Sequence, residues 1–201
     1  MTTLFGQKNL NQTLDVLFTS KARVAVLRLL LLDPVRPYYQ RQVEAATALP
    51  LRAVQRELDR LTTAGLLYRR VEGNRTYYHV DRQFPLFPEL RAMFLKTGTP
   101  LERFRGALAL EESVRLAFLI QDAGKILVVS NGGKRPVAAP PPQCAVEAQS
   151  VETFVRILYE SPATYAPYLS EGVDVLGRRD DVVWRHIEAA GFTVAKAKGV
   201  A

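Results

Sequence analysis

The chain has 201 residues, of which 48% are hydrophobic and 23% charged, a balance typical of folded globular proteins and unlike that of disordered ones. Its net charge of +7 is unevenly placed: residues 1–100 hold 15 Lys and Arg against 8 Asp and Glu, whereas residues 101–201 hold 12 of each. Positive charge concentrated in one half favours a nucleic acid partner, and a solvated basic surface is the alternative.

Cysteine content and hydropathy bear on the compartment. The single cysteine, Cys144, excludes an intramolecular disulfide and fits a reducing environment. The apolar runs, such as residues 29–32 between Arg28 and Asp33, are far too short to span a membrane, and no stretch near the N-terminus has the features of a signal peptide. We therefore expect a cytoplasmic, nucleoid-associated protein with no membrane contact.

The first half begins with a polar segment and two predicted helices. Residues 1–13 are expected to form a loose arm, or a short helix that docks only in a dimer. Residues 21–32 have a strong helical pattern, with Ser20 as the N-cap. Residues 39–48 have the length of a second helix, and Leu49-Pro50 supplies a tight turn after it.

A third helix and a hairpin follow that turn. In residues 50–64 one face is apolar, through Val54, Leu58 and Leu61, and a separate stripe is polar, through Arg52, Gln55, Arg56 and Asp59. Residues 66–80 read as two β-rich runs around a Gly–Asn tip. A helix that buries one side and offers Arg and Gln on the other, followed by a basic hairpin, is suited to reading duplex DNA.

Helix, helix, turn, helix and hairpin is the order of a winged helix-turn-helix, and the residues resemble those of ArsR-like winged-helix regulators of bacteria and archaea. The resemblance rests on LFTSKARVAVLRLLLL, AVQRELDRLTTAGLLYRRVEGNRTYYHV and PLFPELRAMFLKTG, and covers residues 14–97. It implies a DNA-binding domain over residues 14–98, with helix 50–64 in the major groove and hairpin 66–80 as the wing. Pro50 departs from the pattern, because a capping Ser or Thr is expected there; proline suits the first turn of a helix, so a cap is lost without breaking the element.

The candidate DNA contacts follow from this arrangement. Arg52 and Arg56, in the first turns of the third helix, are the best candidates to read bases, and Gln55 could bond an adenine edge. Arg60 is expected at phosphate, and Arg75 at the wing tip in the minor groove. Arg69 and Arg70 point to opposite faces of the hairpin, and the sequence does not decide which faces DNA. The full set of candidates is Gln40, Arg41, Arg52, Gln55, Arg56, Arg60, Arg70, Asn74 and Arg75.

Four tyrosines and two histidines are not among the candidate DNA contacts. In each of the pairs Tyr38-Tyr39 and Tyr77-Tyr78 we expect at least one ring to be structural, because neighbouring residues of a strand face opposite sides. His79, His186 and Cys144 have no clustered partners at metal-ligand spacing. We expect no metal site and no cofactor.

Residues 97–100 are predicted to be a hinge, and residues 101–201 a small mixed α/β domain, which makes the fold class α+β overall. The pattern predicts strands at 114–120, 125–130, 144–148 and 173–176, and helices at 101–110, 151–160 and 180–190. The proline-rich run 136–142 is predicted to be an extended loop.

The segments RLAFLI, KILVVS and YLSEGVDVLGRRDDV resemble, in order, parts of a minimal nucleotidyltransferase domain. That family's activity needs a Gly-Ser turn after the first strand and two aspartates on the next, to hold the triphosphate and two magnesium ions. Here the turn reads QDAG, and Lys125 and Leu127 stand where the acids belong. We expect either a degenerate relative without catalytic activity or an unrelated domain of similar size. In both cases the domain is expected to act by contact, through apolar residues such as Phe154, Ile157 and Leu158 that are not all needed for its own core.

Two functions are open from the sequence. The first is a sequence-specific transcriptional regulator that binds double-stranded DNA as a homodimer, with residues 101–201 supplying dimerisation or binding an effector or a protein partner. The second is a structural DNA-binding protein that bridges or compacts duplexes without sequence preference. Competition between specific and random DNA separates them.

Overall fold

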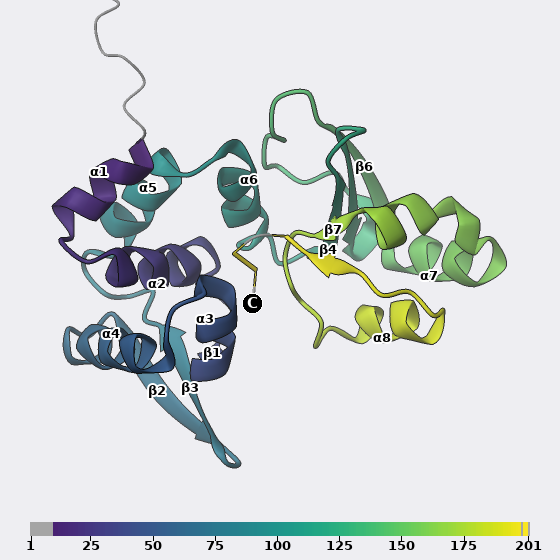
Figure 1. Ribbon diagram of the computed structural model, residues 1–201. Coiled ribbons are helices and arrows are strands. Elements are labelled where there is room, and N and C mark those ends of the chain that lie inside the picture. The colour runs from purple at the N-terminus through teal and green to yellow at the C-terminus, as the bar shows by residue number, and fades with distance from the viewer. Residues whose placement is uncertain (1–9, 198, 201) are drawn as a thin grey trace, which may run out of the picture. The chain divides into compact units, whose positions relative to one another are not determined.

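The computed structural model describes residues 10–197 together with 199 and 200. The chain divides into two compact units, residues 1–106 and 107–201, which are called here the N-terminal unit and the C-terminal unit. Each unit has its own helices and its own β-sheet (Figure 1). The expected mixed α+β class is confirmed.

The N-terminal unit places a small sheet beside five helices. These are α1 (Leu10–Leu17), α2 (Lys21–Leu32), α3 (Gln40–Thr47), α4 (Leu51–Thr63) and α5 (Phe87–Thr97). The sheet has the antiparallel order β1-β3-β2, from β1 (Tyr38–Tyr39), β2 (Leu67–Glu72) and β3 (Arg75–Val80). Ser20 caps α2 as predicted, because its hydroxyl oxygen accepts the Arg23 N–H at 3.2 Å. Pro50 precedes α4 without a side-chain cap.

Helix α1 corrects the prediction for the N-terminal segment, residues 1–13. Residues 1–9 of the expected arm lie outside the described residues, and α1 begins at Leu10. Leu14 is buried, and the ring of Phe18, just after the helix, lies 5.9 Å from that of Phe94 on α5. The helix therefore packs within one chain and does not need a dimer in order to dock.

The division between the units falls after Gly106, later than the hinge that the sequence predicted at 97–100. Helix α6 (Pro100–Leu108) starts as part of the N-terminal unit: Arg91 Nη2 donates to the Gly106 carbonyl at 2.6 Å. A Cβ at Gly106 would lie 2.8 Å from a methyl carbon of Leu95 and 3.3 Å from one of Leu32, so a larger residue there would require these side chains to shift. The residues expected to be a linker are thus held against the preceding helices.

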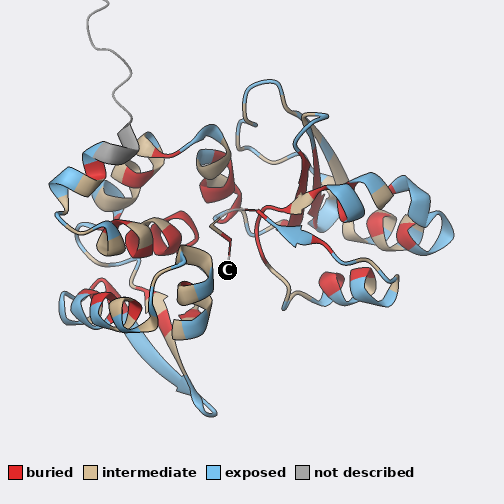
Figure 2. Ribbon diagram, in the orientation of Figure 1, coloured by how far each residue is buried: buried red, intermediate tan, exposed pale blue. Residues whose placement is uncertain are grey.

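The sheet of the N-terminal unit has an inner and an outer face. Leu67, Tyr78 and Val80 are buried on the inner face, together with Tyr38 of β1. Tyr68 and His79 face the other side, because neighbouring residues of a strand point to opposite faces. On β3, His79 on this side is less buried than Tyr78 and Val80. One tyrosine of each pair, Tyr38 and Tyr78, is therefore structural, as predicted. Figure 2 shows that the β2–β3 hairpin is exposed along most of its length.

The C-terminal unit is built on a five-stranded sheet in the order β6-β5-β4-β7-β8. Its strands are β4 (Val114–Ile120), β5 (Lys125–Ser130), β6 (Ala145–Ser150), β7 (Val173–Asp174) and β8 (Ala195–Lys196). β4 is antiparallel to β5 and β7, whereas β5 with β6 and β7 with β8 are parallel. The first two predicted strands are confirmed at their bounds, β7 is shorter than predicted, and β8 was not predicted.

Two α-helices and three single-turn segments complete the C-terminal unit. α7 (Val151–Glu160) begins after a Ser150 cap, and α8 (Val182–Ala189) after an Asp181 cap. Short 3₁₀ turns lie at Asn131–Gly133 and Pro162–Thr164, and a π-helical turn at Pro167–Glu171. Residues 134–144 form no helix or strand, as predicted for the proline-rich loop.

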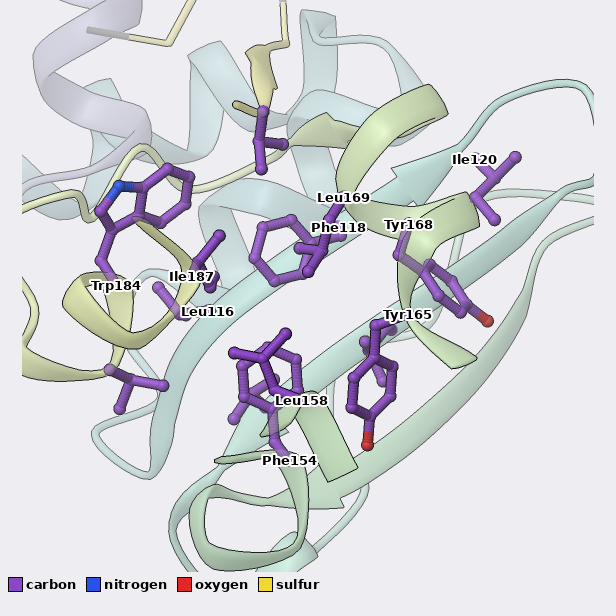
Figure 3. Close-up of a cluster of buried hydrophobic side chains, with 14 residues drawn as sticks. Leu116, Phe118, Ile120, Phe154, Leu158, Tyr165, Tyr168, Leu169, Trp184 and Ile187 are labelled. Carbon is purple, nitrogen blue, oxygen red and sulfur yellow. The ribbon is translucent and has the colours of Figure 1, made fainter. Parts of the chain in front are cut away.

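The core of the C-terminal unit is aromatic at its centre (Figure 3). The ring of Phe118 on β4 lies 6.5 Å from that of Phe154 and 6.1 Å from that of Trp184. Phe154 and Leu158 are almost completely buried in this core, and Ile157 packs against it. The expectation that these α7 residues are available to a partner is wrong for Phe154 and Leu158, because both are buried in the core, whereas Ile157 stays partly exposed.

Across the described part of the chain, no helix combines the length and the apolar character that crossing a membrane requires.

Candidate nucleic-acid interface

Helix α4 separates a buried side from a charged side, as its spacing predicted. Val54 and Leu58 are fully buried and Leu61 nearly so, whereas Arg52, Arg56 and Arg60 are exposed. Arg52 forms no ion pair with a described residue, so its guanidinium is free to take an external acceptor. The helix is fixed by its apolar side, which lets the opposite side present cations in a constant orientation.

A buried carboxylate lies beneath those cations. Glu57 is 0% exposed, and its oxygens lie 3.0 Å from Arg23 Nε of α2, 3.0 Å from Arg60 Nη1 and 4.0 Å from Arg56 Nε. A carboxylate away from water needs such partners, because desolvation otherwise costs several kcal/mol. The side chains of Arg56 and Arg60 are still 61% and 54% exposed. Since a guanidinium has five N–H donors, each can keep Glu57 and offer other donors outward.

The polar stripe predicted for residues 50–64 did not include Glu57, although the helical spacing indicates where Glu57 lies. Glu57 follows Val54 by three residues and precedes Leu61 by four, which places it on the apolar face of the helix. Its partner on α2, Arg23, is 34 residues away, so the pairing itself is a tertiary feature.

Two of the predicted contacts, Gln40 and Gln55, are joined by hydrogen bonds. Gln55 Nε2 on α4 donates to Gln40 Oε1 on α3 at 3.1 Å, and Gln40 Nε2 donates to the Tyr78 hydroxyl on β3 at 3.2 Å. Both glutamines are half-buried. The chain of bonds orients the Gln55 amide and leaves its Oε1 and one N–H without a partner among the described residues, which is the donor and acceptor pair that an adenine edge matches.

Arg69 and Arg70 do lie on opposite faces of the hairpin. Arg69, on the inner face, forms a 2.7 Å ion pair with Asp59 of α4, and its guanidinium carbon lies 5.7 Å from the Tyr78 ring centroid. Arg70 lies 3.4 Å from Glu72 on the same face, and its side chain is 69% exposed. Arg69 therefore ties the hairpin to α4, and Arg70 is the more exposed of the two, at 69% against 45% of the side chain.

The remaining candidates lie near the hairpin tip and the start of α3. Asn74 and Arg75 are exposed, and the Arg75 guanidinium carbon lies 4.9 Å from the centroid of the Tyr39 ring. Arg41, with 71% of its side chain exposed, is 3.1 Å from Glu44. This pair joins neighbouring residues on the solvent side of α3, so a phosphate could replace the carboxylate at small cost.

The histidines and the acids that could bind a metal ion form no such site among the described residues. His79 is stacked on Tyr68, and His186 Nδ1 lies 3.1 Å from the Tyr159 hydroxyl. The described residues include no cluster of three or more His, Cys, Asp or Glu suited to a metal ion. At the positions where a nucleotidyltransferase would need acids, Lys125 is exposed and Leu127 is buried, and the β4–β5 connection is a short turn between antiparallel strands.

The structure thus joins Gln40 to Gln55 and connects Arg56 and Arg60 through Glu57, with Arg52 on the same helix. Arg41 lies on α3, and Arg70, Asn74 and Arg75 lie on the β2–β3 hairpin. Comparison of the chain with protein-family models, with curated proteins and with solved structures gives no match.

Proposed function

We propose that the N-terminal unit is a winged helix-turn-helix and that the protein is a sequence-specific regulator that binds double-stranded DNA. In this proposal α4 enters the major groove and the β2–β3 hairpin is the wing. The observation that carries it is the solvent side of α4, where Arg52, Arg56 and Arg60 stand exposed over a fully buried apolar side.

The electrostatics of this side suit a polyanion. Arg52 has no competing acid among the described residues, and Arg56 and Arg60 share a single carboxylate that is itself out of reach of solvent. A phosphate or a base edge can therefore be added without removing Glu57 from its partners. Arg52, Gln55 and Arg56 are assigned to bases, and Arg60, Arg41 and Arg70 to phosphates.

The protein is proposed to act as a homodimer in the cytoplasm, associated with the nucleoid. A single winged helix buries little surface, and twofold symmetry would let two copies of α4 read half-sites about 34–36 Å apart. The C-terminal unit would supply the dimer contact or bind a protein partner. Its short β4–β5 turn and the residues Lys125 and Leu127 support a role by contact without nucleotidyl transfer.

The test begins with selection of a preferred duplex from a random pool, followed by binding measurements on preferred and random DNA. Arg56→Ala is expected to reduce the ratio of the two affinities by about tenfold, because a base-edge contact carries roughly 1–3 kcal/mol of discrimination. Arg75→Ala should weaken both more evenly. The control is Arg156→Ala in the C-terminal unit, since Arg156 is 63% exposed, much like Arg56, and pairs with Glu160.

The outcomes separate the candidate functions. An unchanged ratio in Arg56→Ala would remove α4 as the reader. Strong, salt-sensitive binding with no preferred sequence would support the alternative, a structural protein that bridges or compacts duplexes. Equal loss in Arg156→Ala would show that the effect comes from net charge alone.

A further inference from the structure

The outer face of the N-terminal sheet carries aromatic and basic side chains that α4 and its contacts do not use. By strand alternation and register, this face consists of Tyr39 of β1, Tyr77 and His79 of β3, and Tyr68 and Arg70 of β2, with Arg75 and its register partner Glu72 at its end. Glu72 is the single acid of this set, and it lies 3.4 Å from Arg70, whose side chain stays 69% exposed. It is called here the outer aromatic face. The opposite face of the same strands is the one buried in the core.

One part of this face is already an open stacking surface. The rings of Tyr68 and His79, which are register partners on β2 and β3, are stacked at 4.9 Å between centroids with planes 9° apart. Tyr68 remains 51% exposed. A ring that is stacked on one side and exposed to this extent leaves aromatic surface available to another planar group.

A second aromatic pair lies two residues along β3. Tyr39 and Tyr77 are register partners with ring centroids 5.8 Å apart in an edge-to-face arrangement, and both are half-buried. The Arg75 guanidinium lies 4.9 Å from the Tyr39 centroid, and Arg70 stands opposite Tyr77. Residues two apart on a strand are about 6.6–6.8 Å apart, so the two aromatic pairs lie side by side along the strand.

The chemistry of this face selects its ligand. Tyrosine and histidine rings offer flat apolar surface to planar groups, and Arg70 and Arg75 add positive charge at the same place. His79 contributes as a neutral ring, since burial lowers the pKa of its imidazole below the ordinary value. Its Nε2 atom is buried and has no hydrogen-bond partner among the described residues, so the ring contributes by stacking and not by a bond from this atom. Flat aromatic surface beside cations fits bases that are attached to phosphates.

We propose that the outer aromatic face binds the unpaired bases of single-stranded nucleic acid, with Tyr68 as the exposed stacking residue and Arg70 and Arg75 as phosphate contacts. Bases within a duplex are covered by their neighbours on both sides and cannot be stacked on from outside. The stacking residue Tyr68 is therefore separate from the duplex contacts proposed for α4, whereas Arg70 and Arg75 are shared with the proposed wing contacts.

The test uses the full-length protein and labelled strands of about 16 nucleotides, a length at the upper end of the site sizes of single-strand binding folds. Four ligands are compared by fluorescence anisotropy: oligothymidylate, oligouridylate, an abasic strand with the same number of phosphates, and a duplex. Both base-bearing strands, or one of them, should bind about tenfold more tightly than the abasic strand, because stacking contributes at every base. Which of the two binds more tightly identifies DNA or RNA as the source.

Variants locate the site. Tyr68→Ala should weaken single-strand binding about tenfold while duplex binding stays the same, and Tyr68→Phe should retain it because the ring is kept. Arg52→Ala is the matched control, expected to weaken duplex binding and leave the single strand unaffected. In Tyr68→Trp, added single strand should quench the new fluorescence, with the parent protein and its one tryptophan, Trp184, as the blank.

The outcomes are distinct for the two sites. Equal affinity for the abasic strand, or an unchanged affinity in Tyr68→Ala, would overturn the single-strand proposal even if duplex binding is strong. Loss of duplex binding in Arg52→Ala bears only on the proposed function. Single-strand binding that depends on Tyr68, in a protein that fails to bind duplex, would support the outer aromatic face and contradict the role given to α4.

Discussion

Arginines in the two units differ in what they contact. In the C-terminal unit, Arg178 donates to the backbone carbonyls of Val114 and Ala109, and Arg115 makes two hydrogen bonds to Asp181, at 2.7 and 2.9 Å. In the N-terminal unit, Arg56 and Arg60 approach one carboxylate and remain more than half exposed. An arginine bound to backbone carbonyls is committed to the fold, whereas one that is mostly solvated can exchange water for a ligand.

The charge of each unit fits this difference. Residues 1–106 carry 17 Lys and Arg against 9 Asp and Glu, and residues 107–201 carry 10 against 11. In the C-terminal unit Arg115 and Arg178 thus satisfy an acid and two carbonyls of the unit itself. The N-terminal unit has an excess, and that excess includes the exposed side of α4 and the hairpin. Four predictions would break or sharpen this comparison.

The largest effect is expected in the core of the C-terminal unit. Phe154→Ala should lower the free energy of unfolding of that unit by about 3–5 kcal/mol, because it removes a fully buried ring and leaves a cavity. Hydrogen exchange of the β4 and β5 amides measures the loss. The α2 and α4 amides serve as the internal reference, and Tyr159→Ala, at a position 55% exposed, is the control variant. Equal loss in both units would show that they unfold together.

The next effect concerns the one buried acid that supports the exposed arginines. Glu57→Ala should lower the free energy of unfolding of the N-terminal unit by about 2 kcal/mol, since charge-assisted hydrogen bonds contribute roughly 1.5–3 kcal/mol and the freed arginines can reach water. This loss is measured by urea denaturation, with a signal from residues of α2 and α4 reporting the unfolding of the N-terminal unit. Glu160→Ala in the C-terminal unit, which breaks an exposed pair at 3.8 Å, should change stability by less than about 1 kcal/mol. If Glu57→Ala and Glu160→Ala lowered the free energy of unfolding by similar amounts, burial would not be the reason why the Glu57 contacts are stronger.

A smaller effect depends on pH and is confined to the N-terminal sheet. The pKa of His79 is lowered from its ordinary 6.5, mainly by burial, with Glu72 opposing the shift and Arg70 adding to it. The unfolded chain therefore binds the proton more readily, so the stability from neutral His79 is present above pH 6.5 and is lost as the pH falls below that value. Unfolding of the parent and of His79→Gln should be compared between pH 7.5 and about 5. If the free energies of unfolding of the two proteins changed in parallel with pH, this would contradict the lowered pKa of His79.

The smallest effect tests the turn between α3 and α4. Ala48 has a φ of 54°, a left-handed conformation that disfavours a Cβ. Ala48→Gly should raise the free energy of unfolding by about 0.5–1 kcal/mol, since relief of strain exceeds the added freedom of glycine in the unfolded chain. Ala53→Gly, inside α4, should do the opposite by about 1 kcal/mol. Thermal denaturation distinguishes them, and a decrease in both would show that the turn is unstrained.

The sequence by itself determined the elements whose pattern is local. The helices at Lys21–Leu32 and Val151–Glu160, the strands at Val114–Ile120 and Lys125–Ser130, and the hairpin at residues 66–80 were predicted close to their observed bounds. Helical and strand periods involve residues three, four or two apart, so a short window contains the whole signal. The separation of α4 into a buried and a charged side followed from the same periods.

Tertiary structure decided how those elements satisfy one another. The pairing of Glu57 with Arg23, and the bond from Gln55 to Gln40, join segments whose meeting depends on how the helices pack. The burial of Phe154 and Leu158 depends on a sheet and a turn that cover α7, so an amphipathic pattern could not show that its apolar face was already occupied. The division after Gly106 likewise depends on contacts of α6 with Leu32 and Leu95, because a Gly–Pro motif marks a change of direction and does not by itself mark the limit of a packed unit.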